Sequence, residues 1–142
     1  MRFETVSKAY RALDPTWRWP NFSIPELACR CCGRFCQGEY WHAPVFLDRL
    51  QNLRDAIGAP LRLTSAHRCD LWNAAIGGAP ASHHKRLAVD IDLTGHDRHA
   101  LLSQAKAHGF RGFGMAKTFL HLDLRPVPAS WYYKGSAPLW QT

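Results

Sequence analysis

The sequence lacks any long apolar run. Its 142 residues contain no stretch near the roughly 20 consecutive apolar residues that a membrane-spanning helix needs. The opening, MRFETVSKAYRALDPTWRWP, has an early acidic residue and no continuous apolar segment, so we expect no secretory signal peptide. Internal repeats and low-complexity tracts are also missing. These absences predict one globular, non-membrane domain over residues 1–142.

Acidic residues are scarce. The chain has 11 Asp and Glu against 18 Lys and Arg, which gives a net charge of +7 with neutral histidines. Such an excess favours an anionic partner such as nucleic acid, a cell-wall polymer or a membrane surface. The basic residues are scattered, however, and a generally basic solvated surface explains them equally well.

Apolar spacing predicts one helix, and capping residues predict two more. PVFLDRLQNLRDAIG (residues 44–58) has helical periodicity and a stop at Gly58. Asp70 is expected to cap a short helix, DLWNAAI, and Asp97 a longer one that ends at Gly109.

Three further segments, LRLTS, LAVDIDL and FLHLDL, alternate as strands do. Together with the helices they predict an α+β fold, with a small, largely antiparallel sheet and flanking helices. We expect an irregular, Cys-containing arm over residues 1–42 and an aromatic tail over residues 125–142, packed on the domain.

Alternation gives two strands a polar face. In LAVDIDL, Asp90 and Asp92 share one face, and in FLHLDL, His121 and Asp123 do the same. A catalytic zinc takes three ligands from His, Asp or Glu, which Asp90, His121 and one histidine of the preceding pair (residues 83–84) could supply. Polar residues on the solvent-exposed face of an antiparallel sheet would give the same pattern. Alternation alone does not distinguish this alternative from a metal site.

Ordered motifs give the chain a resemblance to a known family. They are FSIPELAC (residues 22–29), SAHR (65–68), WNAAIGGAPAS (72–82), AVDI (88–91) and FLHLD (119–123). In this order they resemble the zinc D-alanyl-D-alanine carboxypeptidases and peptidoglycan endopeptidases, which include VanY-like enzymes and phage endolysins. The resemblance implies a hedgehog/D-Ala-D-Ala-peptidase-like fold and hydrolysis of peptidoglycan stem peptides.

The resemblance also implies the zinc ligands, Asp90 and His121 with one of two histidines. The family has seven positions from its histidine to its aspartate, with a glycine between, whereas no glycine lies between Ser82 and Asp90 here. Keeping the Ser-x-His spacing selects His84, and keeping the His-to-Asp spacing selects His83. We favour His84, because the upstream match then runs without a gap.

By resemblance, Arg68 is the arginine that grips a substrate carboxylate or carbonyl, and its planar fork suits that role. Ser82 is either a substrate contact or, as we prefer, a capping hydroxyl. Several relatives place an acid just before the last histidine, but residues 116–119 (AKTF) are not acidic. Asp123 is then the best available carboxylate, as a general base or as the acceptor that orients a ligand histidine. Asp92 is expected to be a supporting or solvent-facing group.

Five cysteines form a further candidate site, comprising Cys29, Cys31, Cys32, Cys36 and Cys69. They could hold a structural zinc, form disulfides or stay reduced, and related sequences suggest that the arm pairs with Cys69. A zinc-stabilised nucleic-acid-binding module is a less favoured alternative. The cluster lacks a second Cys-x-x-Cys pair, and no compact basic patch accompanies it.

The combined prediction is a zinc-dependent peptidase that acts on peptidoglycan, as a D-Ala-D-Ala carboxypeptidase or a cross-link endopeptidase. It would be made in the cytoplasm and act on the wall as a phage or prophage lysin, or as part of a virion. The alternative is a non-catalytic wall-binding or structural virion protein of the same fold. The absent glycine and the absent acid motivate this alternative.

Overall fold

The computed structural model describes the whole chain, residues 1–142. Short strands and helices follow one another in irregular order, and none of the helices combines the length and apolarity needed to cross a membrane. In chain order the elements are β1 (Arg2–Phe3), α1 (Val6–Leu13), the 3-10 helix η1 (Asp14–Thr16), α2 (Ile24–Leu27), β2 (Tyr40–Trp41), α3 (Pro44–Ile57), β3 (Leu63–Ser65), α4 (Asp70–Ala75), the 3-10 helix η2 (His83–Lys85), β4 (Val89–Asp92), α5 (Arg98–Ala107), β5 (Gly112–Met115), β6 (Phe119–Asp123), β7 (Ala129–Tyr132) and α6 (Ala137–Trp140).

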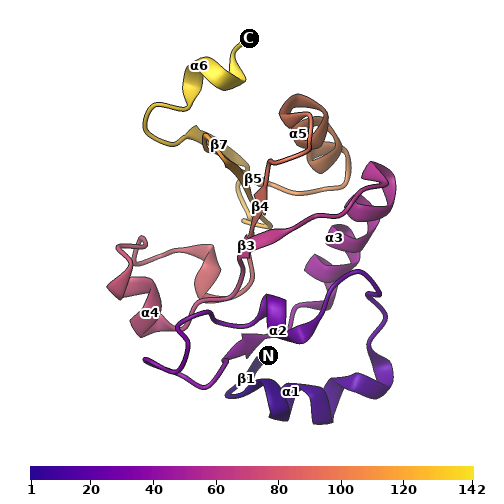
Figure 1. Ribbon diagram of the computed structural model, residues 1–142, viewed down its shortest axis with the longest axis vertical. Coiled ribbons are helices and arrows are strands. Elements are labelled where there is room, and N and C mark those ends of the chain that lie inside the picture. Colours follow the sequence, from indigo (N-terminus) through magenta and orange to yellow (C-terminus); the bar gives the residue numbers. More distant parts are fainter.

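A five-stranded sheet, in the order β3-β4-β6-β5-β7, occupies the centre of the molecule (Figure 1). Strands β3, β4, β6 and β5 pair antiparallel in turn, whereas β7 runs parallel to β5. A second, two-stranded sheet joins β1 to β2 near the N-terminus. The predicted α+β class and largely antiparallel sheet are confirmed, with β7 as the parallel exception.

The predicted helix over residues 44–58 is confirmed as α3. Pro44 stands in its first turn. Backbone N–H groups there have no acceptor within the helix, so the N–H that proline lacks costs no hydrogen bond. Gly58 ends the helix in the left-handed conformation, at φ 69°. A Cβ at Gly58 would meet no atom within 4 Å. An alanine there would therefore strain the backbone without crowding a neighbour.

The two other predicted caps have different outcomes. Asp97 caps α5 as expected, and its carboxylate accepts hydrogen bonds from the backbone N–H groups of His99 and Ala100. Asp70 is not the cap of α4, because the extended backbone continues through Cys69 and makes that residue the N-cap. The Cys69 N–H donates to the sulfur of Cys29, which holds this extended conformation.

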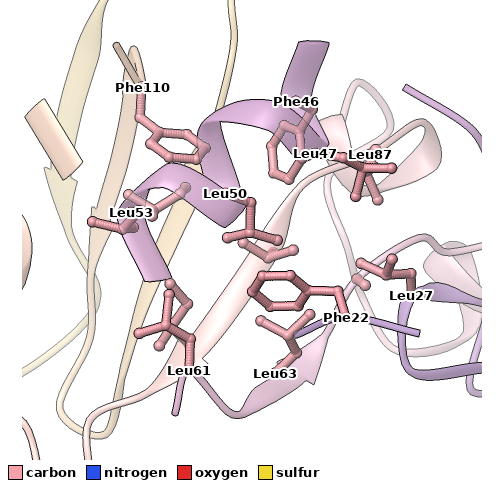
Figure 2. Packing of buried hydrophobic residues seen from close by; sticks show 14 of the residues in the cluster. Phe22, Leu27, Phe46, Leu47, Leu50, Leu53, Leu61, Leu63, Leu87 and Phe110 are labelled. Carbon is pink, nitrogen blue, oxygen red and sulfur yellow. The ribbon is translucent and has the colours of Figure 1, made fainter. Parts of the chain in front are cut away.

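Helix α3 packs its apolar side on the sheet and completes the core. Leu47, Leu50 and Leu53 on this helix are fully buried. Figure 2 shows these leucines in one cluster with Phe22 and with side chains from the β3 segment. Phe46 adds an edge-to-face contact with the ring of Phe110, at 5.5 Å between centroids. The core thus lies on one face of the sheet and leaves the other face for polar groups.

The arm and the tail are more regular than the sequence indicated. The arm, residues 1–42, contains helix α1, in which Thr5 accepts the capping hydrogen bond and Ala9 is fully buried. The tail, residues 125–142, contributes β7 to the central sheet. The indole N–H of Trp140 in α6 donates to the carbonyl of Ala116 and fixes the last helix.

Candidate metal centre

Neighbouring strands β4 and β6 supply two side chains of the site. Asp90 and His121 lie directly opposite each other in the antiparallel register. Cβ atoms in such pairs lie only about 4.5–5.5 Å apart. Ile91, which follows Asp90, and Leu120, which precedes His121, are fully buried. The predicted alternation is confirmed, because one face of both strands enters the core and the other presents acid and imidazole.

The third side chain comes from η2, the short helix before β4. The backbone N–H of His84 donates to Ser82 Oγ at 3.2 Å, so Ser82 caps this turn. His84 is buried, and its ring lies with Asp90 and His121 in a group of potential metal ligands. His83 is only half-buried and does not belong to this group.

The three potential ligand atoms are almost equidistant. His84 Nε2 lies 3.1 Å from Asp90 Oδ1, His121 Nδ1 lies 3.0 Å from the same oxygen, and the two nitrogens are 3.1 Å apart. A tetrahedral zinc with bonds of about 2.0–2.1 Å would place its ligand atoms about 3.3 Å apart. The two imidazoles and the carboxylate therefore fit zinc in kind and in spacing.

Hydrogen bonds on the far side of each imidazole fix the orientation of both rings. His84 Nδ1 lies 2.6 Å from the carbonyl oxygen of Ala66, and His121 Nε2 lies 2.7 Å from Asp123 Oδ2. When a metal binds, an N–H on each of these nitrogens leaves the lone pair of the other nitrogen for the ion. Such outer contacts are typical of metal-binding histidines and set their tautomers.

Asp123 lies behind His121 and does not line the cleft over the site. It is fully buried, and its carboxylate accepts from Arg125 Nη2 at 2.6 Å, Nε at 2.9 Å and the backbone N–H at 3.1 Å. Burial would raise the pKa of Asp123, but hydrogen bonds from Arg125 and His121 outweigh it and hold the pKa well below its usual value. Asp123 is thus an ionised acceptor whose oxygens are already engaged.

The electrostatics of the three-residue group favour a cation. Burial would raise the pKa of Asp90, yet hydrogen bonds from His121 and His84 lower it well below the usual range. Burial would likewise lower the pKa of His121, but hydrogen bonds to Asp123 and Asp90 raise it instead. Two carboxylates, those of Asp90 and Asp123, thus place negative charge beside His121, and this favours a cation at the group.

Two glycines in β5 make room for the site. Gly112 and Gly114 lie opposite Asp123 and His121 in the register of β5 with β6. A Cβ at Gly114 would come within 2.9 Å of the His121 Cβ and 2.8 Å of the Tyr133 ring, and a Cβ at Gly112 would overlap the Asp123 carboxylate. The sequence interpretation missed these residues. The G-x-G spacing was their signal, because it places two glycines on one face of a strand.

A cleft of about 620 Å³ opens over the group. Asp90 is the one acidic residue in its lining, so no free carboxylate faces the potential metal ligands. The lining residues are Arg68, Ile76, Gly77, Gly78, Ala79, Ala81, Ser82, His83, His84, Asp90, Phe119, His121, Arg125, Trp131 and Tyr133.

Arg68, the arginine of the SAHR motif, lies beside the site. Its Nη2 is 3.8 Å from Asp90 Oδ2. Hydrogen bonds from Nε to Ser65 Oγ and from Nη1 to Asn73 Oδ1, both 3.3 Å, hold the side chain in place. Its guanidinium is therefore fixed at the edge of the cleft.

The tail forms one wall of the cleft, which the sequence did not reveal. The Trp131 ring lies 5.4 Å from the His121 ring, and the Arg125 guanidinium lies 4.5 Å from the Trp131 ring centroid. Tyr133 lines the same wall. Asp92, by contrast, lies outside the site. Its carboxylate accepts from the backbone N–H of Thr94 and pairs with an exposed arginine.

Comparison with known proteins adds a second, independent observation. No curated protein matches the chain. A protein family described as Peptidase M15 matches residues 20–123, which is more than half of the chain and includes all three potential metal ligands. That span also contains Arg68 and Asp123. The His/Asp/His group and this match lead to one conclusion: the chain belongs to the peptidase M15 family of zinc-dependent metallopeptidases.

Proposed function

We propose that the chain hydrolyses a peptide bond in the stem peptides of bacterial peptidoglycan, as a carboxypeptidase or a cross-link endopeptidase. The observation that carries the proposal is the convergence of His84, Asp90 and His121 at the cleft, with Arg68 beside them. The net charge of +7 supports an anionic polymer as substrate.

The residues of the cleft have separate tasks in this reaction. His84, Asp90 and His121 would hold the zinc, which, when bound, polarises the scissile carbonyl and activates water as nucleophile. Tyr133 lines the cleft, where its phenol O–H would donate a hydrogen bond to the oxyanion. Burial and the charge of Asp90 raise the pKa of this phenol. Asp123 orients His121 rather than taking a proton from water, since it lies behind the ring.

Arg68 binds a carboxylate or carbonyl of the stem peptide. The Arg68→Lys variant is expected to lower kcat/KM about tenfold or more, because lysine keeps the charge but loses the planar fork. Steady-state kinetics on a defined stem peptide measure this. Arg62→Lys is the matched control, since Arg62 is an exposed arginine that pairs with Asp92 outside the cleft. Equal activity of wild type and Arg68→Lys would contradict the role.

Asp123→Asn tests the positioning role. We expect zinc affinity to fall about 10- to 100-fold, because the amide is a weaker acceptor for His121 Nε2–H and leaves Arg125 unpaired. Zinc titration with a competing chelator measures the affinity. With saturating zinc, kcat is expected to recover. A kcat that remains at least about 100-fold below the wild-type value under saturating zinc would instead identify Asp123 as the general base.

A second candidate function is non-catalytic binding to the wall. One observation favours it, namely that Asp90 is the sole carboxylate lining the cleft and is itself a ligand candidate. In this case the chain would bind peptidoglycan and leave it intact.

Digestion of purified peptidoglycan separates the two functions. The zinc-loaded protein is incubated with sacculi, and mass spectrometry follows both free D-alanine and the loss of cross-linked fragments. Release of either product by the wild type and not by His121→Ala supports the peptidase. Cosedimentation with sacculi without any product supports the binding protein. Which product is released decides between carboxypeptidase and endopeptidase.

The wall is also the proposed place of action, with the chain working as a phage or prophage lysin or as a virion component. Lysis of bacteria from within on expression together with a holin, and no lysis with His121→Ala, would support the lysin. Absence of lysis by an enzyme that digests sacculi would contradict it.

A further inference from the structure

A second cluster of metal-ligating side chains lies outside the cleft. The sulfurs of Cys29, Cys31, Cys36 and Cys69 all lie within 4.8 Å of one another. Three come from the segment between α2 and β2, and the fourth is the N-cap of α4, about 40 residues further along the chain. The fold therefore brings four thiols from two distant segments to one point.

The arrangement of the four sulfurs fits a tetrahedral ion. A zinc with four Zn–S bonds of about 2.3 Å spaces its sulfurs about 3.8 Å apart. Cys31 Sγ and Cys36 Sγ are 3.4 Å apart. A disulfide joins two sulfurs at about 2.05 Å. Two disulfides would not require all four sulfurs to surround one point, whereas a tetrahedral ion does.

The backbone around the cluster supplies donors to the sulfurs. The N–H groups of Cys36, Glu39 and Cys69 donate to the sulfurs of Cys31, Cys36 and Cys29, each at 3.4 Å. Hydrogen bonds of this kind stabilise the negative charge of sulfur ligands.

The fifth cysteine is kept out of the group. Cys32 is exposed, and it adopts φ 58°, followed by Gly33 at φ 82°. This left-handed pair turns the chain back so that Cys31 and Cys36 point inward together. Glycine at the second position adopts this conformation without strain.

We propose that Cys29, Cys31, Cys36 and Cys69 bind a structural zinc ion, separate from the ion of the cleft. Four protein ligands close the coordination sphere, as in structural zinc sites, and binding displaces the thiol protons to solvent. The ion ties the arm to the residue that directly follows Arg68 and thereby fixes the base of α4 at the cleft. This site does not depend on the proposed reaction.

Metal analysis of the full chain tests the proposal. Zinc per chain, measured by elemental analysis after reducing purification, is expected to be two in the wild type and in Cys32→Ser, and one in Cys36→Ser and in His121→Ala. Cys32→Ser is the matched control, because it removes a cysteine from the same loop without touching the cluster. One zinc in the wild type that is lost in His121→Ala would overturn the proposal.

Cobalt gives a readout that needs no cysteine variant, which matters if Cys36→Ser does not fold. The cleft group offers no sulfur, so thiolate-to-cobalt charge-transfer absorption reports the cysteine cluster alone. We expect this absorption in cobalt-loaded wild type and, undiminished, in cobalt-loaded His121→Ala. Absence of this absorption would show that the cysteines do not bind the metal. An intact mass lower by two hydrogens per pair of cysteines would show that they form disulfides. Either result would overturn the proposal.

Discussion

His84→Ala is expected to lose the zinc of the cleft and about a thousandfold or more of peptidase activity. The ring nitrogen of His84 is one of three nearly equidistant ligand atoms, and two remaining ligands do not hold a catalytic zinc. Loss of the ion removes several kcal/mol of transition-state stabilisation, and each 1.4 kcal/mol is about tenfold in rate. Zinc content and turnover of a stem peptide, measured on the same preparation, check both effects.

His83→Ala is the matched control for this prediction. The two histidines are adjacent and similar in chemistry, but His83 is half-buried and lies outside the ligand group. We expect His83→Ala to keep its cleft zinc and to change activity by a small factor at most. The opposite pattern, with zinc lost in His83→Ala and kept in His84→Ala, would mean that the loop before β4 has the other register.

Gly112→Ala is expected to weaken zinc binding about 10- to 100-fold, although no metal ligand is changed. The new Cβ would overlap the Asp123 carboxylate, which must then move and release His121 Nε2. The same overlap is expected to lower the free energy of unfolding by about 1–3 kcal/mol. Zinc titration and chemical denaturation measure the two effects separately.

Gly58→Ala is the control for stability alone. Gly58 has φ 69° and open space around its Cα, so alanine there strains the end of α3 by about 1–2 kcal/mol and touches nothing near the cleft. We expect this variant to have a lower melting temperature than the wild type and the same affinity for zinc. If Gly112→Ala and Gly58→Ala bound zinc equally well, the glycine would have no role in placing Asp123.

The sequence was sufficient for those parts of the site that follow from local pattern. Alternation within β4 and β6 placed Asp90 and His121 on the polar faces of their strands, because a strand with one face in the core has only one acceptable register. The helix over residues 44–58 followed from its period and its terminal glycine in the same way. These predictions needed no knowledge of which strand pairs with which.

The remaining parts depend on long-range pairing. Whether His83 or His84 points inward depends on a single 3-10 turn, which has no periodic signal of its own. The wall formed by Trp131 and Tyr133 exists because β7 adds to the sheet in parallel beside β5, a connection that short patterns do not encode. The role of Gly112 and Gly114 in making room for the site can be recognised only when β6 is known to be the neighbouring strand.

The position of β7 has a consequence for the nascent chain. Trp131 and Tyr133 line the cleft, yet they follow all three potential metal ligands in the sequence and therefore leave the ribosome after them. Bacterial and eukaryotic ribosomes add roughly 5–20 residues per second, and domains fold as their segments emerge. The three potential metal ligands are therefore synthesised before the residues of the wall. The cleft is complete only when β7 has paired with β5.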